Sequence, residues 1–131
     1  MIVVDTNVLA YLYLPGTHSV AAEALLLKDS EWAAPRLWRS EFRNVLATYM
    51  RGRLLSFDDA VRIHRKAESL MADGEYDVGA VEVLRLAKDS GCSAYDCEFV
   101  ALAEHLDVKL VSADARLCKA FPKRTRILSG A

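Results

Sequence analysis

The chain has 131 residues, of which 53% are hydrophobic and 27% charged, and its formal net charge is −1. This composition fits one globular domain over residues 1–131 and argues against a disordered chain or a strongly basic nucleic-acid binder. The three cysteines fit neither a disulfide framework nor a CxxC ligand pair. The sequence opens without a signal peptide, and no apolar stretch approaches the ~20 residues that span a bilayer. We therefore expect a cytoplasmic protein without membrane association.

Short apolar strands are predicted to alternate with amphipathic helices. Residues 1–4 are predicted to form a buried strand, and a helix over residues 6–14 follows, ended by Pro15-Gly16. Further helices are predicted over about 18–28, 37–51, 57–71, 81–88, 93–105 and 115–121, and further strands over 31–35, 108–114 and 126–128. The chain between the second and third of these strands is predicted to be all-helical.

This alternation favours a parallel sheet with helices on both faces. The expected fold class is α/β, a three-layer α/β/α domain with a short, mostly parallel central sheet. In such sheets, sites form beyond the carboxyl ends of the strands. Asp5 directly follows the first strand, and Asp114 lies two residues after Ser112, near the end of the strand over 108–114. If the two strands are neighbours, both carboxylates lie at one edge of the sheet.

Two further acids lie on helix faces that are otherwise apolar. Glu41 has Trp38 at i−3 and Val45 at i+4, and Asp96 has Phe99 at i+3. A lone buried carboxylate is costly unless it is paired or binds a metal. A cluster of Asp5, Glu41, Asp96 and Asp114 around a divalent cation accounts for all four, and an oxygen-only ligand set favours Mg²⁺, with Mn²⁺ as an alternative ion.

Each acid also has a structural explanation. Asp5 and Asp114 are suitable N-caps of the helices that follow them, and Asp96 completes a Ser-x-x-Asp capping box with Ser93. Glu41 is the acid that a surface position explains least well, because its neighbours on the helix are large and apolar.

Three segments together resemble the PIN domain: "IVVDTNVL", "SEFRNVL" and "SAYDCEFVALAEHLDVKLVSADARL". The resemblance covers essentially the whole chain and, in size, is closest to the VapC-type ribonuclease toxins of type II toxin–antitoxin pairs. It implies that Asp5, Glu41, Asp96 and Asp114 form the acidic metal-binding and catalytic quartet. It also implies that Asn7 orients Asp5 and that Ser112 stands where the family often has Thr or Ser.

The resemblance implies a Mg²⁺-dependent endoribonuclease that hydrolyses RNA phosphodiester bonds and pairs with a cognate antitoxin. A homodimer is expected, with apolar residues of the first helices, such as Tyr11, Tyr13 and Leu14, as its contact. Between Arg36 and Lys66 there are eight basic and three acidic residues, a net charge of +5. Because the whole chain has a net charge of −1, the remaining 100 residues have a net charge of −6. Such a basic segment suits a phosphate backbone or an acidic antitoxin tail. The candidates for this contact are Arg39, Arg43, Arg51 and Arg53.

Three other functions are compatible with parts of the pattern. An aspartyl-nucleophile phosphatase also begins with a strand ending in Asp, but it needs a second Asp two residues later, where this chain has Asn7. A PIN-domain nuclease of RNA processing without an antitoxin, and a non-catalytic metal-binding domain that docks a partner, both keep the four acids.

Overall fold

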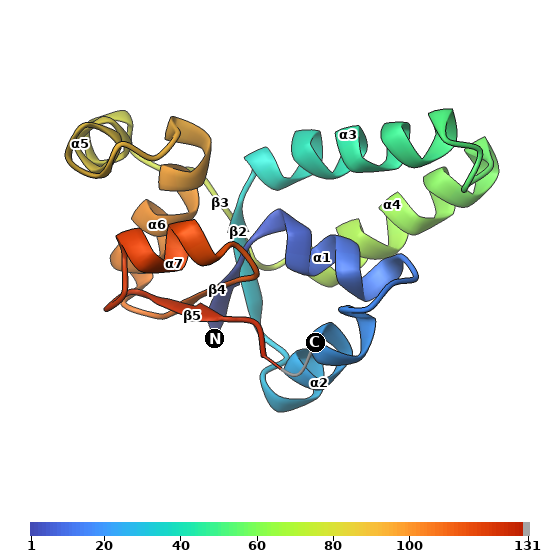
Figure 1. The fold of residues 1–131 in the computed structure, drawn as a ribbon, viewed down its shortest axis with the longest axis horizontal. Helices are drawn as coiled ribbons and strands as arrows, with labels where there is room; N and C mark the ends of the chain where they lie inside the picture. The colour runs from blue at the N-terminus through green and yellow to red at the C-terminus, as the bar shows by residue number, and fades with distance from the viewer. Residues whose placement is uncertain (130–131) are drawn as a thin grey trace.

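The computed structural model describes residues 1–129, which form a five-stranded sheet with helices on both sides (Figure 1). The strands are β1 (Ile2–Val4), β2 (Trp32–Pro35), β3 (Glu75–Tyr76), β4 (Leu110–Ser112) and β5 (Thr125–Ile127). The helices are α1 (Thr6–Tyr13), α2 (Ser19–Lys28), α3 (Leu37–Arg51), α4 (Phe57–Met71), α5 (Ala80–Ser90), α6 (Ala94–Leu106) and α7 (Ala115–Ala120). All neighbouring strands pair in parallel, in the order β3-β2-β1-β4-β5. The α/β prediction is confirmed.

The helices form two outer layers. Helix α6 contacts β1, β2 and β4 and packs on α5, whereas α1 contacts β4 and packs on α2, α3 and α4. Figure 1 shows these groups on opposite sides of the sheet, with α3 and α4 extending as an antiparallel pair beyond it. None of the helices within residues 1–129 is both long enough and apolar enough to cross a bilayer.

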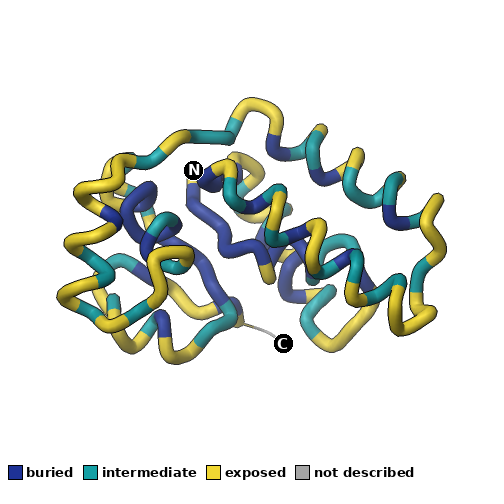
Figure 2. The backbone as a smooth tube through the Cα atoms, turned by 90° about the horizontal axis from the view of Figure 1, so that it is seen from above, coloured by how far each residue is buried: buried dark blue, intermediate teal, exposed yellow. Residues whose placement is uncertain are grey.

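The core lies along the central strands. Val3 and Val4 of β1 and Leu110 of β4 are completely buried, because helices cover both faces of the sheet at this point. Trp38 and Phe42 of α3 contribute large side chains from one layer. In Figure 2 the buried segments run through the centre of the molecule, with exposed segments on the outside. This packing holds the ends of β1 and β4 in fixed positions.

Strand β3 was not predicted, so the expectation of an all-helical stretch between β2 and β4 is wrong. The strand has only two residues, too few for an alternating pattern, yet it pairs with Ala34 and Pro35 of β2. The sequence cue is Gly74, because a Cβ atom at this position would overlap the carbonyl oxygen of Trp32. Glycine therefore permits the close approach of the two backbones.

Candidate active site

Four acidic side chains line one pocket of about 520 Å³. Asp5 and Asp114 reach it from the carboxyl ends of β1 and β4, which are neighbours in the sheet. Glu41 reaches it from α3 and Asp96 from the first turn of α6. The complete lining is Asp5, Thr6, Asn7, Leu37, Ser40, Glu41, Asn44, Val45, Tyr95, Asp96 and Asp114.

Asp5 is held by the neighbouring strand. Its residue is 8% exposed, and its Oδ2 accepts a hydrogen bond of 2.8 Å from Ser112 Oγ. Asp5 occupies the N-cap position of α1, but its side chain makes no capping hydrogen bond. The capping explanation therefore does not account for this carboxylate, whereas burial and the Ser112 hydroxyl fix it at the base of the pocket.

Glu41 is anchored by Thr6, which was not among the site residues predicted from the sequence. Thr6 Oγ1 donates a hydrogen bond of 2.7 Å to Glu41 Oε1. Thr6 is buried in the first turn of α1, directly after Asp5, so the start of α1 positions one acid and anchors another. The bond uses one oxygen of Glu41 and fixes the half-buried side chain between α1 and α3.

Asp114 both caps a helix and lines the pocket. Its Oδ1 accepts hydrogen bonds from the backbone N–H groups of Arg116 (2.9 Å) and Leu117 (3.2 Å), which caps α7, while the residue also lines the pocket. Asp96 lies on a helix that Ser93 caps, because Ser93 Oγ accepts the Asp96 N–H at 3.0 Å. Capping and pocket lining are therefore compatible for both residues.

Burial raises the pKa values of three pocket acids. For Asp5, burial is the largest cause; the hydrogen bond from Ser112 opposes it, and the charges of Asp96 and Asp114 add to the rise. Burial likewise raises the pKa of Glu41 most, with Thr6 opposing it and Asp5 and Asp96 adding to it.

The pKa of Asp96 is raised by burial and by the charge of Asp114, against the opposing effects of Ser93 and Arg116. Glu98, half-buried on α6, also adds to the raised pKa of Glu41 and was not singled out from the sequence. Ionised carboxylates repel one another in this pocket, and a cation would relieve that repulsion.

The donor set fits a hard divalent cation. All four acidic groups offer oxygen atoms, and no histidine or cysteine lines the pocket. Within residues 1–129, no three Asp, Glu, His or Cys side chains already form a ready-made metal-binding group.

Asn7 lines the pocket, but its side chain makes no hydrogen bond to Asp5 in the described structure. The orienting bond that we expected from Asn7 comes instead from Ser112, whose Oγ also accepts the Asp114 N–H at 3.0 Å. Sequence reasoning overlooked Asn44 and Tyr95 as pocket residues. Asn44 lies one turn after Glu41 on the same helix face, and Tyr95 directly precedes Asp96, so their spacing was the available cue.

The four arginines selected from the sequence fall into two groups. Arg39 donates hydrogen bonds to Glu75 at 2.7 and 3.1 Å and to Glu68 at 2.8 Å, so its guanidinium is engaged within the fold. Arg43, Arg51 and Arg53 are exposed on α3 and the turn that follows it. None of the four lines the acidic pocket, and Arg43 lines a separate groove between α3 and α4.

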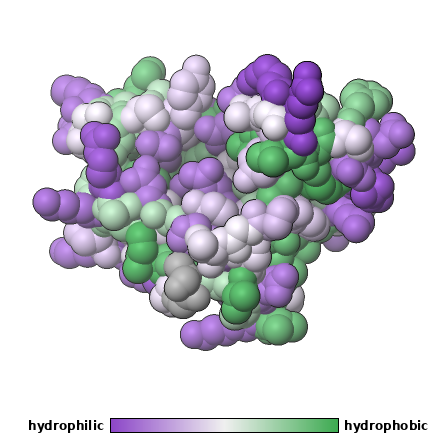
Figure 3. Space-filling view, turned by 45° about the vertical axis from the view of Figure 1, so that its right-hand side comes forward, coloured by the Kyte–Doolittle hydropathy of each residue, from purple (hydrophilic) through white to green (hydrophobic). Residues whose placement is uncertain are grey.

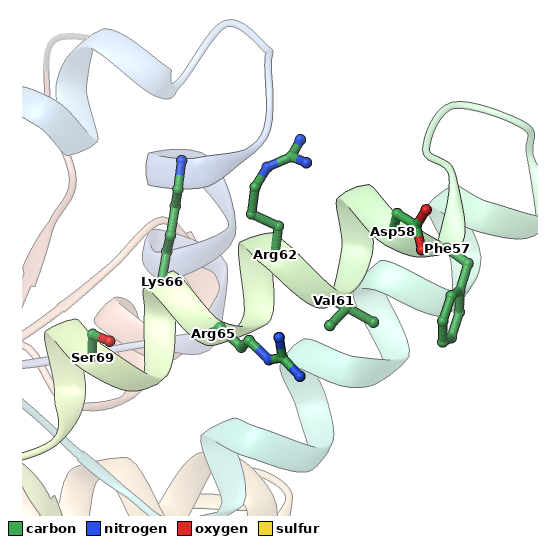
Figure 4. Close-up of a pocket in the computed structure, with 7 residues that line it drawn as sticks. All are labelled: Phe57, Asp58, Val61, Arg62, Arg65, Lys66 and Ser69. Atoms are coloured by element: carbon green, nitrogen blue, oxygen red, sulfur yellow. The ribbon is translucent and has the colours of Figure 1, made fainter.

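A second hollow, of about 530 Å³, runs along the outer face of α4 and has no cluster of acids. Figure 4 shows Arg62 and Lys66 on one side of this helix and Arg65 pointing to another. Its lining includes three cations, Asp58 and Ser69. The acidic pocket, rather than this equally large hollow, therefore has the groups needed for metal-assisted chemistry.

Comparisons with known proteins show which family the chain belongs to. The family model described as "PIN domain" matches residues 2–121. The chain is 31% identical over 134 aligned positions to Ribonuclease VapC3 of Pyrobaculum aerophilum, covering 92% of this chain and 95% of that protein.

Two solved structures share the fold. FitAcB from Neisseria gonorrhoeae matches with a TM-score of 0.73 and 19% identity over 98% of this chain and 97% of the other. A toxin–antitoxin complex from Klebsiella pneumoniae matches with a TM-score of 0.72 and 13% identity over 100% of both chains. Because the family model spans most of the sequence and the ribonuclease relative matches nearly all of it, the chain belongs to the PIN-domain family.

Proposed function

We propose that this chain is a metal-dependent endoribonuclease and the toxin of a type II toxin–antitoxin pair. The observation that supports this most is that Asp5, Glu41, Asp96 and Asp114 line one pocket in a PIN-domain chain. The similarity to Ribonuclease VapC3 supports RNA as the substrate. The phosphatase alternative lacks its general acid, because Asn7 occupies that position.

The four carboxylates would hold Mg²⁺ or Mn²⁺, with Asp5 and Asp96 as the first choices for direct ligands. Such an ion, when bound, lowers the pKa of water and stabilises negative charge on a phosphate. Ser112 keeps the Asp5 carboxylate in place through its 2.8 Å hydrogen bond, and Thr6 does the same for Glu41 at 2.7 Å. Glu41 and Asp114 complete the acidic set, and one of them orients the attacking water.

The activity is tested with end-labelled total RNA, purified protein and Mg²⁺, with EDTA as the metal-free reaction. We expect internal cleavage by the wild type and none by Asp5→Asn. Asp58→Asn is a matched control, because Asp58 is an exposed acid on α4 that lies outside the acidic pocket. Cleavage that persists in a folded Asp5→Asn variant would remove Asp5 from the mechanism.

The antitoxin partner is supported by the fold shared with the Klebsiella pneumoniae toxin–antitoxin complex. If a small antitoxin-like gene lies immediately upstream, co-expression with its product should give a stable complex with reduced ribonuclease activity. Absence of such a gene, together with RNA cleavage, would favour a PIN-domain nuclease of RNA processing. Metal binding without cleavage of any RNA would favour the non-catalytic docking domain.

The expected homodimer concerns a separate surface. Leu14, which together with Tyr11 and Tyr13 was expected to form a dimer contact, is 4% exposed and part of the core, so it is not available for that contact. Large exposed apolar side chains lie elsewhere, for example Leu27 of α2 and Leu84 of α5. Figure 3 shows hydrophobic residues beside hydrophilic ones on the face that it draws. Light scattering of the isolated chain tests the dimer directly.

A further inference from the structure

Tyr95 is the tyrosine of this chain that folding does not explain. The other four, Tyr11, Tyr13, Tyr49 and Tyr76, all pack against the main hydrophobic core. Tyr95 is 62% exposed, belongs to neither core cluster and makes no hydrogen bond through its hydroxyl within residues 1–129. A single exposed ring is common on protein surfaces, so its position decides whether a ligand can use it.

The position of this ring links it to the acidic pocket. Tyr95 is the second residue of α6 and directly precedes Asp96, and both residues line the pocket together with Asp5. Phe57 is the other strongly exposed aromatic residue, at 70%, but it lies at the start of α4 and lines different hollows. Exposure alone therefore does not distinguish Tyr95; exposure at this pocket does.

We propose that the ring of Tyr95 is a stacking platform for an unpaired RNA base next to the phosphate that is cleaved. The inference rests on the proposed ribonuclease function and adds a residue that positions the substrate. The base must be unpaired, because a base within a duplex is already stacked on its neighbours.

The charge of the pocket explains why such a platform is needed. Four carboxylates line the pocket, and none of its lining residues is Lys or Arg. Arg116 acts electrostatically on Asp96, but it is not among the lining residues. Phosphate contacts alone therefore cannot seat RNA here until a cation is bound. Stacking a base on a tyrosine supplies binding that does not depend on charge and works with any base, since every base has a π-face.

The test measures binding separately from cleavage. The probes are RNAs of one fixed sequence, 10 nucleotides long, each with a single 2-aminopurine at a different position. The fluorescence of this base falls when it stacks. The protein is the Asp5→Asn variant in Mg²⁺, so that RNA remains intact. We expect quenching at one or two adjacent positions of the probe. The quenching should be lost in the double variant with Tyr95→Ala and kept with Tyr95→Phe, which preserves the ring.

Steady-state cleavage gives a second measurement. Tyr95→Ala should raise KM by at least about fivefold, within the roughly 5- to 150-fold range that base–aromatic stacking is worth. Its kcat and its Mg²⁺-dependent thermal shift should stay close to wild type. An abasic nucleotide at the quenched position should raise KM for the wild type and leave no further difference between wild type and Tyr95→Ala. Phe57→Ala is the matched control, an exposed aromatic removed away from the acids.

The outcomes separate the two proposals. Quenching that requires Tyr95 in a protein that cleaves no RNA would support the platform and overturn the ribonuclease function. Cleavage with unchanged KM and quenching in Tyr95→Ala would overturn the platform and leave the ribonuclease intact. A loss of melting temperature or of the metal-dependent shift in Tyr95→Ala, but not in Tyr95→Phe, would show a structural role and overturn the platform as well. A lost antitoxin complex with unchanged RNA binding would assign the ring to the partner protein instead.

Discussion

Ser112 Oγ donates a 2.8 Å hydrogen bond to Asp5 Oδ2, which joins the ends of two neighbouring parallel strands inside the acidic pocket. The same oxygen accepts the backbone N–H of Asp114 at 3.0 Å. Ser112 is fully buried, so neither bond competes with water. One hydroxyl group therefore sets the position of the Asp5 carboxylate and of the backbone that presents Asp114.

Replacing this serine tests how far the pocket depends on it. We expect Ser112→Ala to lower the free energy of unfolding by about 1.5–3 kcal/mol, the usual worth of a hydrogen bond to a charged group. The affinity for Mg²⁺ should also fall, because Asp5 loses its fixed orientation. Chemical denaturation and metal titration measure the two effects. Ser90→Ala is a suitable control, since Ser90 also accepts a backbone N–H, that of Cys92, away from the pocket. Equal metal affinities in both variants would contradict the role given to Ser112.

Asp5→Asn should separate two effects of the acidic pocket: the loss of stability from repulsion between carboxylates without metal, and the gain of stability when Mg²⁺ binds. Without metal, the neutral side chain removes a buried negative charge from the neighbourhood of Asp96 and Asp114, so the variant should melt at a higher temperature than wild type. Free Mg²⁺ at 100 times its Kd should stabilise the wild type by about 2.7 kcal/mol, and the variant by much less. Differential scanning calorimetry with and without Mg²⁺ measures both. A variant that gains as much from Mg²⁺ as the wild type would exclude Asp5 as a ligand.

The pH dependence of the metal-free protein follows from the raised pKa of Asp5, whose main cause is burial. Between the unfolded carboxyl pKa of about 4 and the higher folded pKa, the folded state binds more protons than the unfolded state. The free energy of unfolding contributed by Asp5 therefore falls as pH rises through this window. The Asp5→Asn variant does not lose this contribution. The difference between its free energy of unfolding and that of wild type should therefore grow as pH rises from about 4, and then level off. Urea denaturation between pH 3.5 and 8 checks it, and an advantage that shrinks with rising pH would contradict the pKa direction.

Much of this fold could be predicted because its elements have strong local patterns. The amphipathic spacing of α3 and the capping box at Ser93 led to helices that the structure contains. Strand β3 could not be found in this way, because two residues give no periodicity and its pairing with β2 is a long-range contact. Only the close backbone approach at Gly74 marks it, and that is visible only once Trp32 is in place.

The acids of the candidate site could be predicted from the sequence, but the hydrogen bonds that hold them could not. The four acids could be selected because strand ends and apolar helix faces are unusual places for a carboxylate. Ser112 was implied by the family resemblance, but its bond to Asp5, which spans 107 positions, was not predicted. Thr6 was not selected at all, since its partnership with Glu41 spans 35 positions. Nor does sequence show that the guanidinium of Arg39 is already engaged, because its acidic partners lie on other elements.

The ion pairs of Arg39 lead to a last prediction, a contrast between two arginines of one helix. Burial acts to raise the pKa of Glu75, but hydrogen bonds from Arg39 and Trp38 outweigh it and hold that pKa below its ordinary value. Arg39→Ala would leave the Glu75 side chain, 6% exposed, with a single ion pair to Arg36 at 3.2 Å and one hydrogen bond from Trp38. We expect a loss of about 2–3 kcal/mol, below the usual cost of breaking a fully buried pair because Arg39 is partly exposed.

Arg43→Ala should leave the stability of the fold nearly unchanged, because Arg43 is exposed and has no ion pair within residues 1–129. Its free energy of unfolding should stay within about 0.5 kcal/mol of wild type. If Arg43 contacts an RNA phosphate, the variant should bind RNA more weakly. The negative slope of log affinity against log salt concentration should also become shallower by about 1. Denaturant unfolding and RNA binding at several salt concentrations, measured on both variants, give the comparison. Unchanged stability in Arg39→Ala together with a reduced salt slope would mean that Arg39 leaves its acidic partners to bind RNA, as the sequence had suggested.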